Sequence, residues 1–214
     1  MAFVGKKFPN LNVNAMNEMG DTFKINVLEE AQKNNKKVIL FWYPKDFTFV
    51  CPTELHAFQA ALGEFEKRNT MVIGASCDTP EVHFAWLSTD KDNGGIEGVT
   101  YPILADSNRN LAATLDILDI TDKTYDEEND VITVKGDNVT YRATFLIDEE
   151  GTVFHESINH MPLGRNVNEY LRLIDAYAHV QEVGEVCPAN WEKGKDAMSA
   201  NREGVASYLS THAN

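Results

Sequence analysis

The sequence predicts an α/β protein with a central mixed sheet flanked by helices, an N-terminal hairpin and a C-terminal arm. Short, wholly apolar runs such as Val38 to Tyr43 are typical of strands that are covered on both faces. Segments with helical spacing separate these runs, as in strand–helix–strand units. In the later part of the chain, strand patterns follow one another without a helix between them. This order predicts a sheet that is parallel in one half and antiparallel in the other.

The first half of the chain alternates extended and helical patterns. A turn at residues 20–21, followed by alternating apolar positions, predicts an N-terminal hairpin. The polar stretch 29–37 leads into the apolar strand 38–43, which Pro44 ends. From Pro52 onward, apolar residues recur at helical spacing and predict a helix. The alternation continues with a strand at 71–76, a helix from 79 to 87, a strand at 101–106 and a short helix at 109–115.

The second half begins with an acidic, turn-rich segment at residues 119–138. Its end and the residues behind it predict two strands that are joined by the turn 136–138. In the second of these strands, Arg142 and Thr144 lie on the face opposite to Ala143, because successive strand side chains alternate. A strand at 152–159 and a helix from Val167 to about His179 complete the pattern.

The length of 214 residues is enough to bury a substantial core. We expect one folded domain at residues 1–180. Residues 181–214 contain glycines, a proline and polar residues without a clear period, so we expect an arm that packs on a folded structure.

The composition excludes several classes of partner. With 33 acidic and 19 basic residues, the formal charge of −14 disfavours nucleic acid and anionic membranes. The N-terminus has neither a basic start nor a long apolar run, which indicates a cytoplasmic protein without a secretory signal. The three cysteines are scattered and show no zinc spacing, so we expect neither a disulfide framework nor a metal site.

The stretch FWYPKDFTFVCPTEL is where the sequence would build a reactive thiol. Cys51 is expected at the N-cap of a helix, with Pro52 at the first helical position and Glu54 in the first turn. Unpaired backbone N–H groups and the helix dipole then favour a thiolate, and the Thr48 hydroxyl can add a hydrogen bond. The alternative is a small buried cysteine. The position between a polar turn and a helix start favours the reactive interpretation.

Two cysteine blocks carry a resemblance to a known family. Pro44, Thr48 and Cys51 stand in a P-x-x-x-T-x-x-C arrangement that resembles the signature of the peroxiredoxins. GEVCPANW, which contains Cys187, resembles the resolving-cysteine segment of the typical two-cysteine subgroup. That subgroup includes bacterial alkyl hydroperoxide reductase C. The resemblance extends to FPNL, HFAW, YPILAD, YRATFLID and MPLGRNVNEYLRLIDA. It implies a thioredoxin-like fold and a peroxidase that uses no metal, haem or flavin of its own.

The resemblance also implies roles for single residues. The Cys51 thiolate would attack a hydroperoxide and become a sulfenic acid. The Thr48 hydroxyl, the Cys51 backbone N–H and the Arg142 guanidinium would donate to the peroxide oxygens. Glu54 would orient the arginine and Pro44 would shield the sulfenate. Without the resemblance, Arg142 would be a solvated strand residue, Pro44 a strand terminator and Glu54 a helix cap.

Cys187 would then condense with the sulfenic acid to form a disulfide, which an external dithiol reduces. The sequence alone leaves open which copy of the chain donates Cys187. The family implies the neighbouring chain, a homodimer that assembles into a ring such as a decamer, and reduction by thioredoxin or a flavin-dependent disulfide reductase. Cys77 lies at a strand end and is expected to be a packing residue.

Two other functions stay open at this point. A cysteine hydrolase would also use a thiol at a helix start, but it needs a histidine base that the sequence does not assign. A chaperone-like holdase would be a second, non-enzymatic role of the same scaffold.

Overall fold

The structure is a computed structural model that describes residues 2–120 and 122–212. The chain forms two compact units, one up to Arg165 and one from Asn166 onward, and each is described by itself. Residue 180, after which the predicted arm begins, lies within helix α6, Val167–Val183. No helix in the described ranges is both long enough and apolar enough to cross a membrane.

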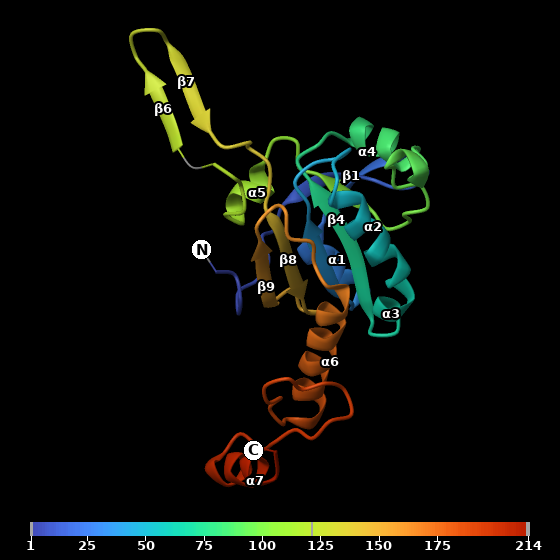
Figure 1. Ribbon diagram of the computed structural model, residues 1–214, viewed down its shortest axis with the longest axis vertical. Helices are drawn as coiled ribbons and strands as arrows, with labels where there is room; N and C mark the ends of the chain where they lie inside the picture. Colours follow the sequence, from blue (N-terminus) through green and yellow to red (C-terminus); the bar gives the residue numbers. More distant parts are fainter. Residues whose placement is uncertain (1, 121, 213–214) are drawn as a thin grey trace. The chain divides into compact units, whose positions relative to one another are not determined.

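The first unit is built on a seven-stranded mixed sheet with the order β2-β1-β5-β4-β3-β8-β9 (Figure 1). β3 runs parallel to β4 and β4 parallel to β5, whereas the remaining neighbours are antiparallel. The predicted mixed sheet and N-terminal hairpin are therefore confirmed. The strands are β1 Asn12–Met16, β2 Thr22–Asn26, β3 Lys37–Trp42, β4 Thr70–Ser76, β5 Ile103–Ala105, β8 Arg142–Ile147 and β9 Val153–Asn159.

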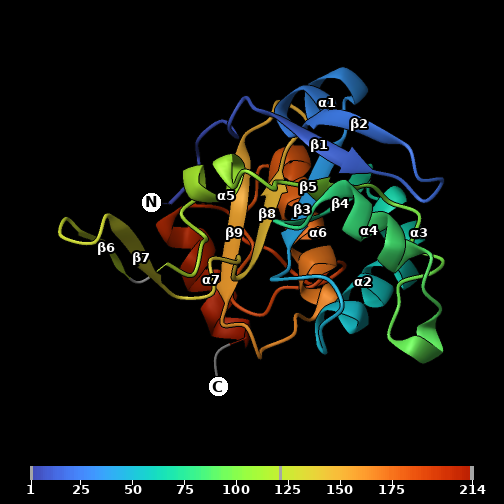
Figure 2. The same cartoon turned by 90° about the horizontal axis from the view of Figure 1, so that it is seen from above.

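Helices cover both faces of this sheet (Figure 2). On β3, Leu40 points into a core cluster that also contains Ala31 of α1 and Leu111 of α5. On the other face, the Phe41 ring stacks on Phe58 of α2 with centroids 3.9 Å apart. The helices of this unit are α1 Val27–Asn34, α2 Cys51–Ala60, α3 Leu62–Glu66, α4 Pro80–Leu87, the 3-10 turn Lys91–Asn93 and α5 Asn110–Thr114.

Helix α1 occupies most of the segment that the sequence presents only as a polar stretch. The Asn26 side chain accepts a hydrogen bond from the Glu29 N–H at 3.4 Å and starts the helix. Asn35 ends it with a left-handed φ of 49°. Only Val27 and Ala31 are buried in it, so its apolar stripe is too thin to be seen as a period.

The acidic segment folds differently from the prediction. β6 Asp122–Asp126 pairs with β7 Val131–Lys135 in a separate two-stranded sheet (Figures 1 and 2). The expectation that residues 131–135 pair with the following strand is wrong, because β8 pairs with β3 and β9. Residues 136–138 instead return the chain toward Asp119, whose N–H donates to the Val139 carbonyl at 2.8 Å.

The second unit consists of α6 and a segment that ends in α7, Arg202–His212. α6 extends to Val183, beyond the predicted end near His179, and Gly184 ends it with a φ of 75°. Between the helices, Val186 and Met198 form an isolated antiparallel bridge. The predicted arm therefore has more regular structure than its sequence indicates.

Candidate active site

Cys51 is the first residue of α2, and the N-cap is Val50 rather than Cys51. The Val50 carbonyl accepts hydrogen bonds from the Thr53 and Glu54 N–H groups at 3.1 and 3.3 Å. The helix therefore starts one residue earlier than predicted, with Pro52 at its second position. The thiol still belongs to the first turn, where backbone N–H groups lack helical partners.

The Cys51 thiol is fully buried and lies against a guanidinium. Arg142, the first residue of β8, donates from Nη1 to the Cys51 Sγ at 3.4 Å. It is itself buried, and its Nε donates to the Met161 carbonyl. Successive side chains of β8 alternate between the two faces of the sheet. Ala143 therefore faces the core cluster, and the Arg142 side chain lies on the other face, at the start of α2.

A buried carboxylate holds this arginine. Glu54 Oε2 accepts from Arg142 Nη1 at 2.7 Å and from Arg165 Nη2 at 2.8 Å. Glu54 Oε1 accepts from the Arg165 Nε at 2.8 Å and from its backbone N–H at 2.9 Å. Glu54 is therefore engaged by two arginines, and no side-chain cap bond starts the helix. A carboxylate between two guanidiniums fixes the orientation of both.

Arg165 is a site residue that the sequence pattern alone does not reveal. Its Nη1 donates to the Ala143 carbonyl at 2.9 Å, and its guanidinium lies 5.2 Å from the centre of the Phe41 ring. The only sequence signal is its place in MPLGRNVNEYLRLIDA, a segment that resembles the family. Its 111-residue separation from Glu54 gives no local pattern.

Asp46, in the loop between β3 and α2, forms hydrogen bonds with buried side chains. The Tyr43 hydroxyl donates to Asp46 Oδ1 at 2.8 Å, and the His83 Nδ1 lies 2.7 Å from Asp46 Oδ2. Burial raises the pKa of Asp46, and the hydrogen bond with His83 opposes that rise. Phe47 has a φ of 54°, in the left-handed region that a bulky residue rarely adopts. The surrounding contacts therefore hold the loop in a defined shape.

Four of the predicted residues line one cavity of about 560 Å³: Pro44, Thr48, Cys51 and Arg142. Pro44 is buried, and the half-buried Thr48 donates from its hydroxyl to the Lys45 carbonyl at 2.8 Å. Glu54 lies behind Arg142. The rest of the wall is mostly apolar and consists of Lys45, Phe49, Val50, Asp137, Val139, Met161 and Pro162.

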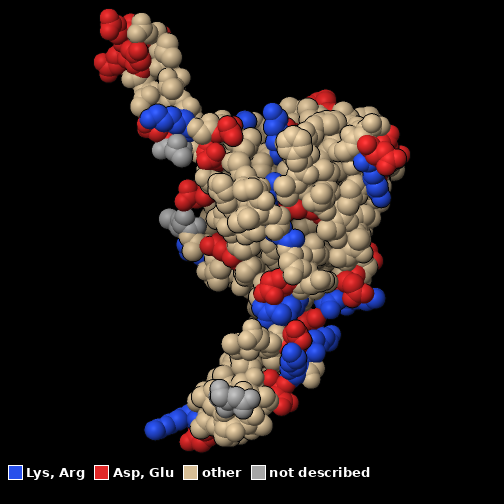
Figure 3. Space-filling view, in the orientation of Figure 1, with Lys and Arg blue, Asp and Glu red and all other residues tan. Residues whose placement is uncertain are grey.

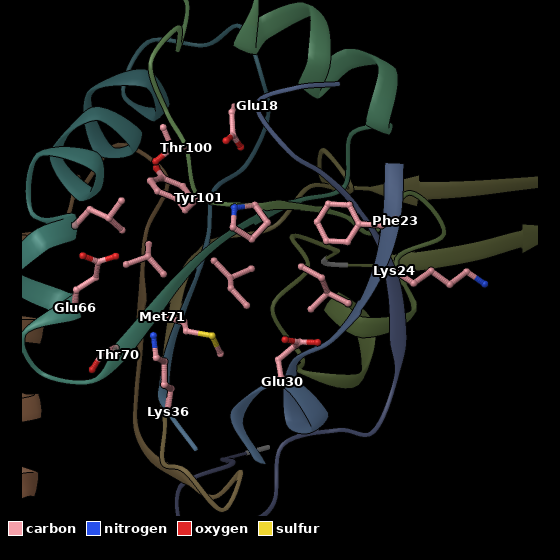
Figure 4. A pocket seen from close by; sticks show the side chains of 15 residues that line it. Glu18, Phe23, Lys24, Glu30, Lys36, Glu66, Thr70, Met71, Thr100 and Tyr101 are labelled. Atoms are coloured by element: carbon pink, nitrogen blue, oxygen red, sulfur yellow. The ribbon is translucent and has the colours of Figure 1, made fainter. Parts of the chain in front are cut away.

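A second cavity of about 520 Å³ shares none of these residues (Figure 4). Charged side chains such as Glu18, Lys36 and Glu66 surround an apolar floor that includes Phe23 and Met71. Its described lining contains neither cysteine nor histidine. Of these two cavities, the Cys51 cavity is therefore the one whose lining includes a thiol.

Cys187, in the second unit, has a different environment. Its half-buried Sγ donates to the Ala176 carbonyl of α6 at 3.7 Å. Burial raises the pKa of Cys187, and the Arg172 charge opposes that rise. Arg172 itself is held by Glu169 and donates to the Trp191 carbonyl at 3.0 Å. Cys187 therefore favours the protonated thiol at neutral pH.

Cys77 is a buried thiol with a strongly raised pKa. Burial and, secondarily, the Asp106 charge raise its pKa to about 12. It belongs to the main core cluster, in agreement with the packing role that the sequence predicts. Two histidines have hydrogen-bond partners of their own. The His83 Nδ1 lies 2.7 Å from Asp46 Oδ2, and the His56 Nε2 lies 3.1 Å from the Gly95 carbonyl oxygen.

Comparison with known proteins agrees with the two cysteine blocks. Residues 4–156 match the AhpC/TSA family, and residues 176–211 match the C-terminal domain of 1-Cys peroxiredoxin. Alkyl hydroperoxide reductase C of Helicobacter pylori is 42% identical over 193 residues, covering 90% of this chain and 87% of the relative. Peroxiredoxin-2 of Bos taurus is 37% identical over 211 residues, covering 99% and 96%.

Solved structures show the same similarity. The reduced 2-Cys peroxiredoxin of Plasmodium vivax has a TM-score of 0.85 and 37% identity, over 98% of this chain and 100% of that one. AhpC of Enterococcus faecalis has a TM-score of 0.71 and 32% identity, over 88% and 100%. With its α/β thioredoxin-like sheet and its two cysteine blocks, the chain belongs to the AhpC/TSA family as a typical 2-Cys peroxiredoxin, a thiol peroxidase that reduces hydroperoxides.

Proposed function

We propose that Cys51 is the nucleophile of this peroxidase. The observation that carries the proposal is the 3.4 Å hydrogen bond from Arg142 to the Cys51 sulfur inside the cavity. A charge-assisted donor favours an anionic acceptor, and the thiolate is the form that attacks peroxides. The sulfur bonds to the terminal peroxide oxygen, the O–O bond breaks, and the leaving oxygen takes up a proton and departs as water or an alcohol. Cys51 becomes a sulfenic acid.

The surrounding residues stabilise this step. Arg142 and the Cys51 backbone N–H donate to the peroxide oxygens, where charge develops as the O–O bond breaks. The Thr48 hydroxyl, which donates to the Lys45 carbonyl in this structure, rotates and donates its one proton to the peroxide instead. Glu54 and Arg165 hold the Arg142 guanidinium in place through the bonds described above. The buried Pro44 forms part of the wall and limits the access of water to the sulfenic acid.

Cys187 resolves the sulfenic acid. Its thiolate attacks the oxidised Cys51 sulfur, an S–S bond forms as the S–O bond breaks, and the displaced hydroxide takes up a proton and leaves as water, so that each cycle consumes one peroxide. A disulfide needs Cα atoms within about 7 Å, and Cys51 is fully buried. The first turn of α2 therefore opens locally before the sulfurs meet. The disulfide joins two copies of the chain, and an external dithiol, a thioredoxin or a flavin-dependent disulfide reductase, restores both thiols by exchange.

A solved relative, Prx1a of Plasmodium yoelii modified at its N-terminus, forms an artifactual octamer. For this chain we propose a homodimer that assembles further into a decameric ring in the cytoplasm, where reduced dithiols keep the cycle running. Relatives named for the chloroplast and the mitochondrion show that the family is not confined to one compartment. A holdase role of the ring stays a prediction. Sedimentation of the reduced protein measures the mass of the assembly.

One experiment tests the catalytic assignment. The reduced protein is mixed with one equivalent of hydrogen peroxide, and peroxide loss is followed together with a non-reducing gel. We expect rapid loss and a disulfide-linked dimer, no dimer in Cys187→Ser, and neither signal in Cys51→Ser. Fast peroxide consumption by Cys51→Ser would overturn the proposal.

A further inference from the structure

The segment that carries Cys187 lies against α6 within the second unit. Figure 1 shows the chain after α6 turning back beside the end of that helix. Trp191 is 3% exposed, and its carbonyl accepts a hydrogen bond from Arg172 Nη1 at 3.0 Å. The Cys187 Sγ donates to the Ala176 carbonyl at 3.7 Å. This hydrogen bond must break before the half-buried sulfur can attack oxidised Cys51.

One imidazole of α6 contacts this segment on both sides of Cys187. The His179 Nε2 lies 3.3 Å from Oε2 of Glu185, two residues before the cysteine. Because a carboxylate only accepts hydrogen bonds, Nε2 is the donor. The centre of the His179 ring lies 5.1 Å from that of Trp191, four residues after the cysteine, and the two ring planes are 42° apart. His179 therefore contacts both ends of the stretch 185–191.

We propose that His179 is a positioning residue of the resolving step, which holds residues 185–191 on α6 and sets how readily Cys187 is released. This rests on the proposed function, in which Cys187 attacks the Cys51 sulfenic acid. A protonated imidazole strengthens both contacts, because it pairs with a carboxylate and lies beside an indole ring. Histidine side chains ordinarily gain this charge between pH 8 and pH 5. Release of the segment should therefore become rarer as the pH falls through this range.

Other charged groups lie near His179 on both elements. Asp175 and Glu182 are one turn before and one turn after it on α6, where side chains three and four residues apart are neighbours. Asp175 also pairs with Lys193 of the segment at 3.7 Å. Figure 3 shows acidic and basic side chains close together on this unit. The bond to Glu185 joins His179 directly to the segment, so the Glu185 carboxylate is the partner to test.

Hydrogen exchange measures the release of the segment without relying on thiol chemistry. The amides of Val186 and Met198 donate to each other's carbonyls at 2.9 and 3.2 Å, so their exchange reports its opening. His179→Gln keeps a donor for the carboxylate and removes the ring and its charge. We expect this variant to exchange both amides about threefold faster than the wild type at pH 6, and at nearly the wild-type rate at pH 8.

The matched control is Lys193→Gln, which removes another charged contact between the same segment and α6. The Lys193 side chain is 75% exposed, so its ion pair contributes little. We expect exchange of the two amides to stay at the wild-type rate in this variant. Unchanged exchange in His179→Gln at pH 6, or equal acceleration by both variants, would overturn the proposal.

The rate of disulfide formation, followed by rapid quench and non-reducing gels, tests the effect on resolution. We expect His179→Gln to form the linked dimer about threefold faster than the wild type at pH 6 and equally fast at pH 8. In a Glu185→Gln background, the same substitution should change the rate at pH 6 by no more than about 1.5-fold, because the carboxylate partner is gone. Comparing rates within each background also cancels the effect of the Glu185 charge on Cys187. Equal acceleration in both backgrounds, or slower dimer formation, would contradict the holding role.

Failure of the proposed function would look different. A linked dimer that persists in Cys187→Ser would show that Cys187 is not the resolving thiol, whereas amide exchange would still report whether His179 holds the segment. The rate of peroxide attack on Cys51 should be the same in His179→Gln and the wild type, since His179 acts on the segment that carries Cys187. A loss of that rate equal to the change in disulfide formation would assign His179 to the fold as a whole and overturn the proposal.

Discussion

The two thiols of the proposed cycle, Cys51 and Cys187, have opposite surroundings. Cys51 is fully buried and receives a hydrogen bond from a guanidinium that a carboxylate holds in place. Cys187 is half-buried, donates to a backbone carbonyl, and has a pKa raised by burial. The first environment provides a charged hydrogen-bond donor to the sulfur, and the second favours the protonated thiol. This difference between the two sites is the basis of the proposed order, in which Cys51 reacts with peroxide first and Cys187 reacts second.

The largest loss of activity is expected when Arg142, the donor to the Cys51 sulfur, is replaced. Arg142→Met removes the hydrogen bond to Sγ and a donor to the leaving oxygen, so we expect kcat/KM for hydrogen peroxide to fall about 10²- to 10³-fold. Arg142→Lys should recover little, because an ammonium cannot reproduce the planar fork. Stopped-flow peroxide consumption measures both.

The matched control for this variant is Arg172→Met, which removes the arginine near the second thiol. It should leave the rate of peroxide attack within about twofold, since Arg172 acts on Cys187 rather than on Cys51. Equal losses in the two variants would remove the proposed difference between the thiol sites.

A smaller loss of activity is expected for Arg165, which contacts Glu54 rather than the Cys51 sulfur. Arg165→Met leaves Glu54 with a single arginine, so Arg142 is less well oriented and kcat/KM should fall about tenfold. Breaking this buried ion network should also lower the free energy of unfolding by about 3 kcal/mol. Urea unfolding measures the stability, and Arg165→Lys should restore part of it. A variant with lower stability but an unchanged rate would assign Arg165 to the fold alone.

The rate at which Cys187 forms the disulfide with oxidised Cys51 should depend on pH. Because burial raises the pKa of Cys187, the thiolate fraction is small at neutral pH and grows as pH rises. We expect disulfide formation, followed by rapid quench and non-reducing gels between pH 6 and 9, to accelerate by up to about tenfold per unit where the chemical step limits. Arg172→Met should slow it at a given pH, since the opposing charge is lost. A rate that is the same at every pH would contradict this prediction.

Most of the predicted residues around Cys51 lie in one continuous stretch, and the resemblance to the peroxiredoxin signature, rather than the pattern alone, predicted roles for Pro44, Glu54 and Arg142. Pro44, Thr48 and Cys51 enclose a cavity that a local turn and helix start create, and strand alternation directs Arg142 toward it. Arg165 could not be found in this way, because its contact with Glu54 depends on long-range folding.

The same distinction between local and long-range signals explains the errors in the fold. The length and type of most strands follow from apolar runs, whereas helix α1 buries only two side chains and has no visible period. The predicted pairing of β7 with the strand that follows it was wrong, because a run of β-branched residues indicates a strand but does not specify its partner. The acidic β6, whose sequence resembles part of a turn-rich segment, is the partner it takes.

Cys77 should show the smallest effect and serves as the internal reference for both thiols. Burial and the nearby Asp106 raise its pKa to about 12. Cys77 is more buried than Cys187, and none of the hydrogen bonds described above joins it to an arginine. We expect Cys77→Ala to leave kcat/KM within about twofold, with a modest loss of stability from the removed sulfur. At pH 8, iodoacetamide followed by mass spectrometry should label Cys187 well before Cys77. Labelling of Cys77 as early as Cys187 would show that burial does not suppress the reactivity of a thiol in this chain. Burial could then not explain the low reactivity expected of Cys187 either.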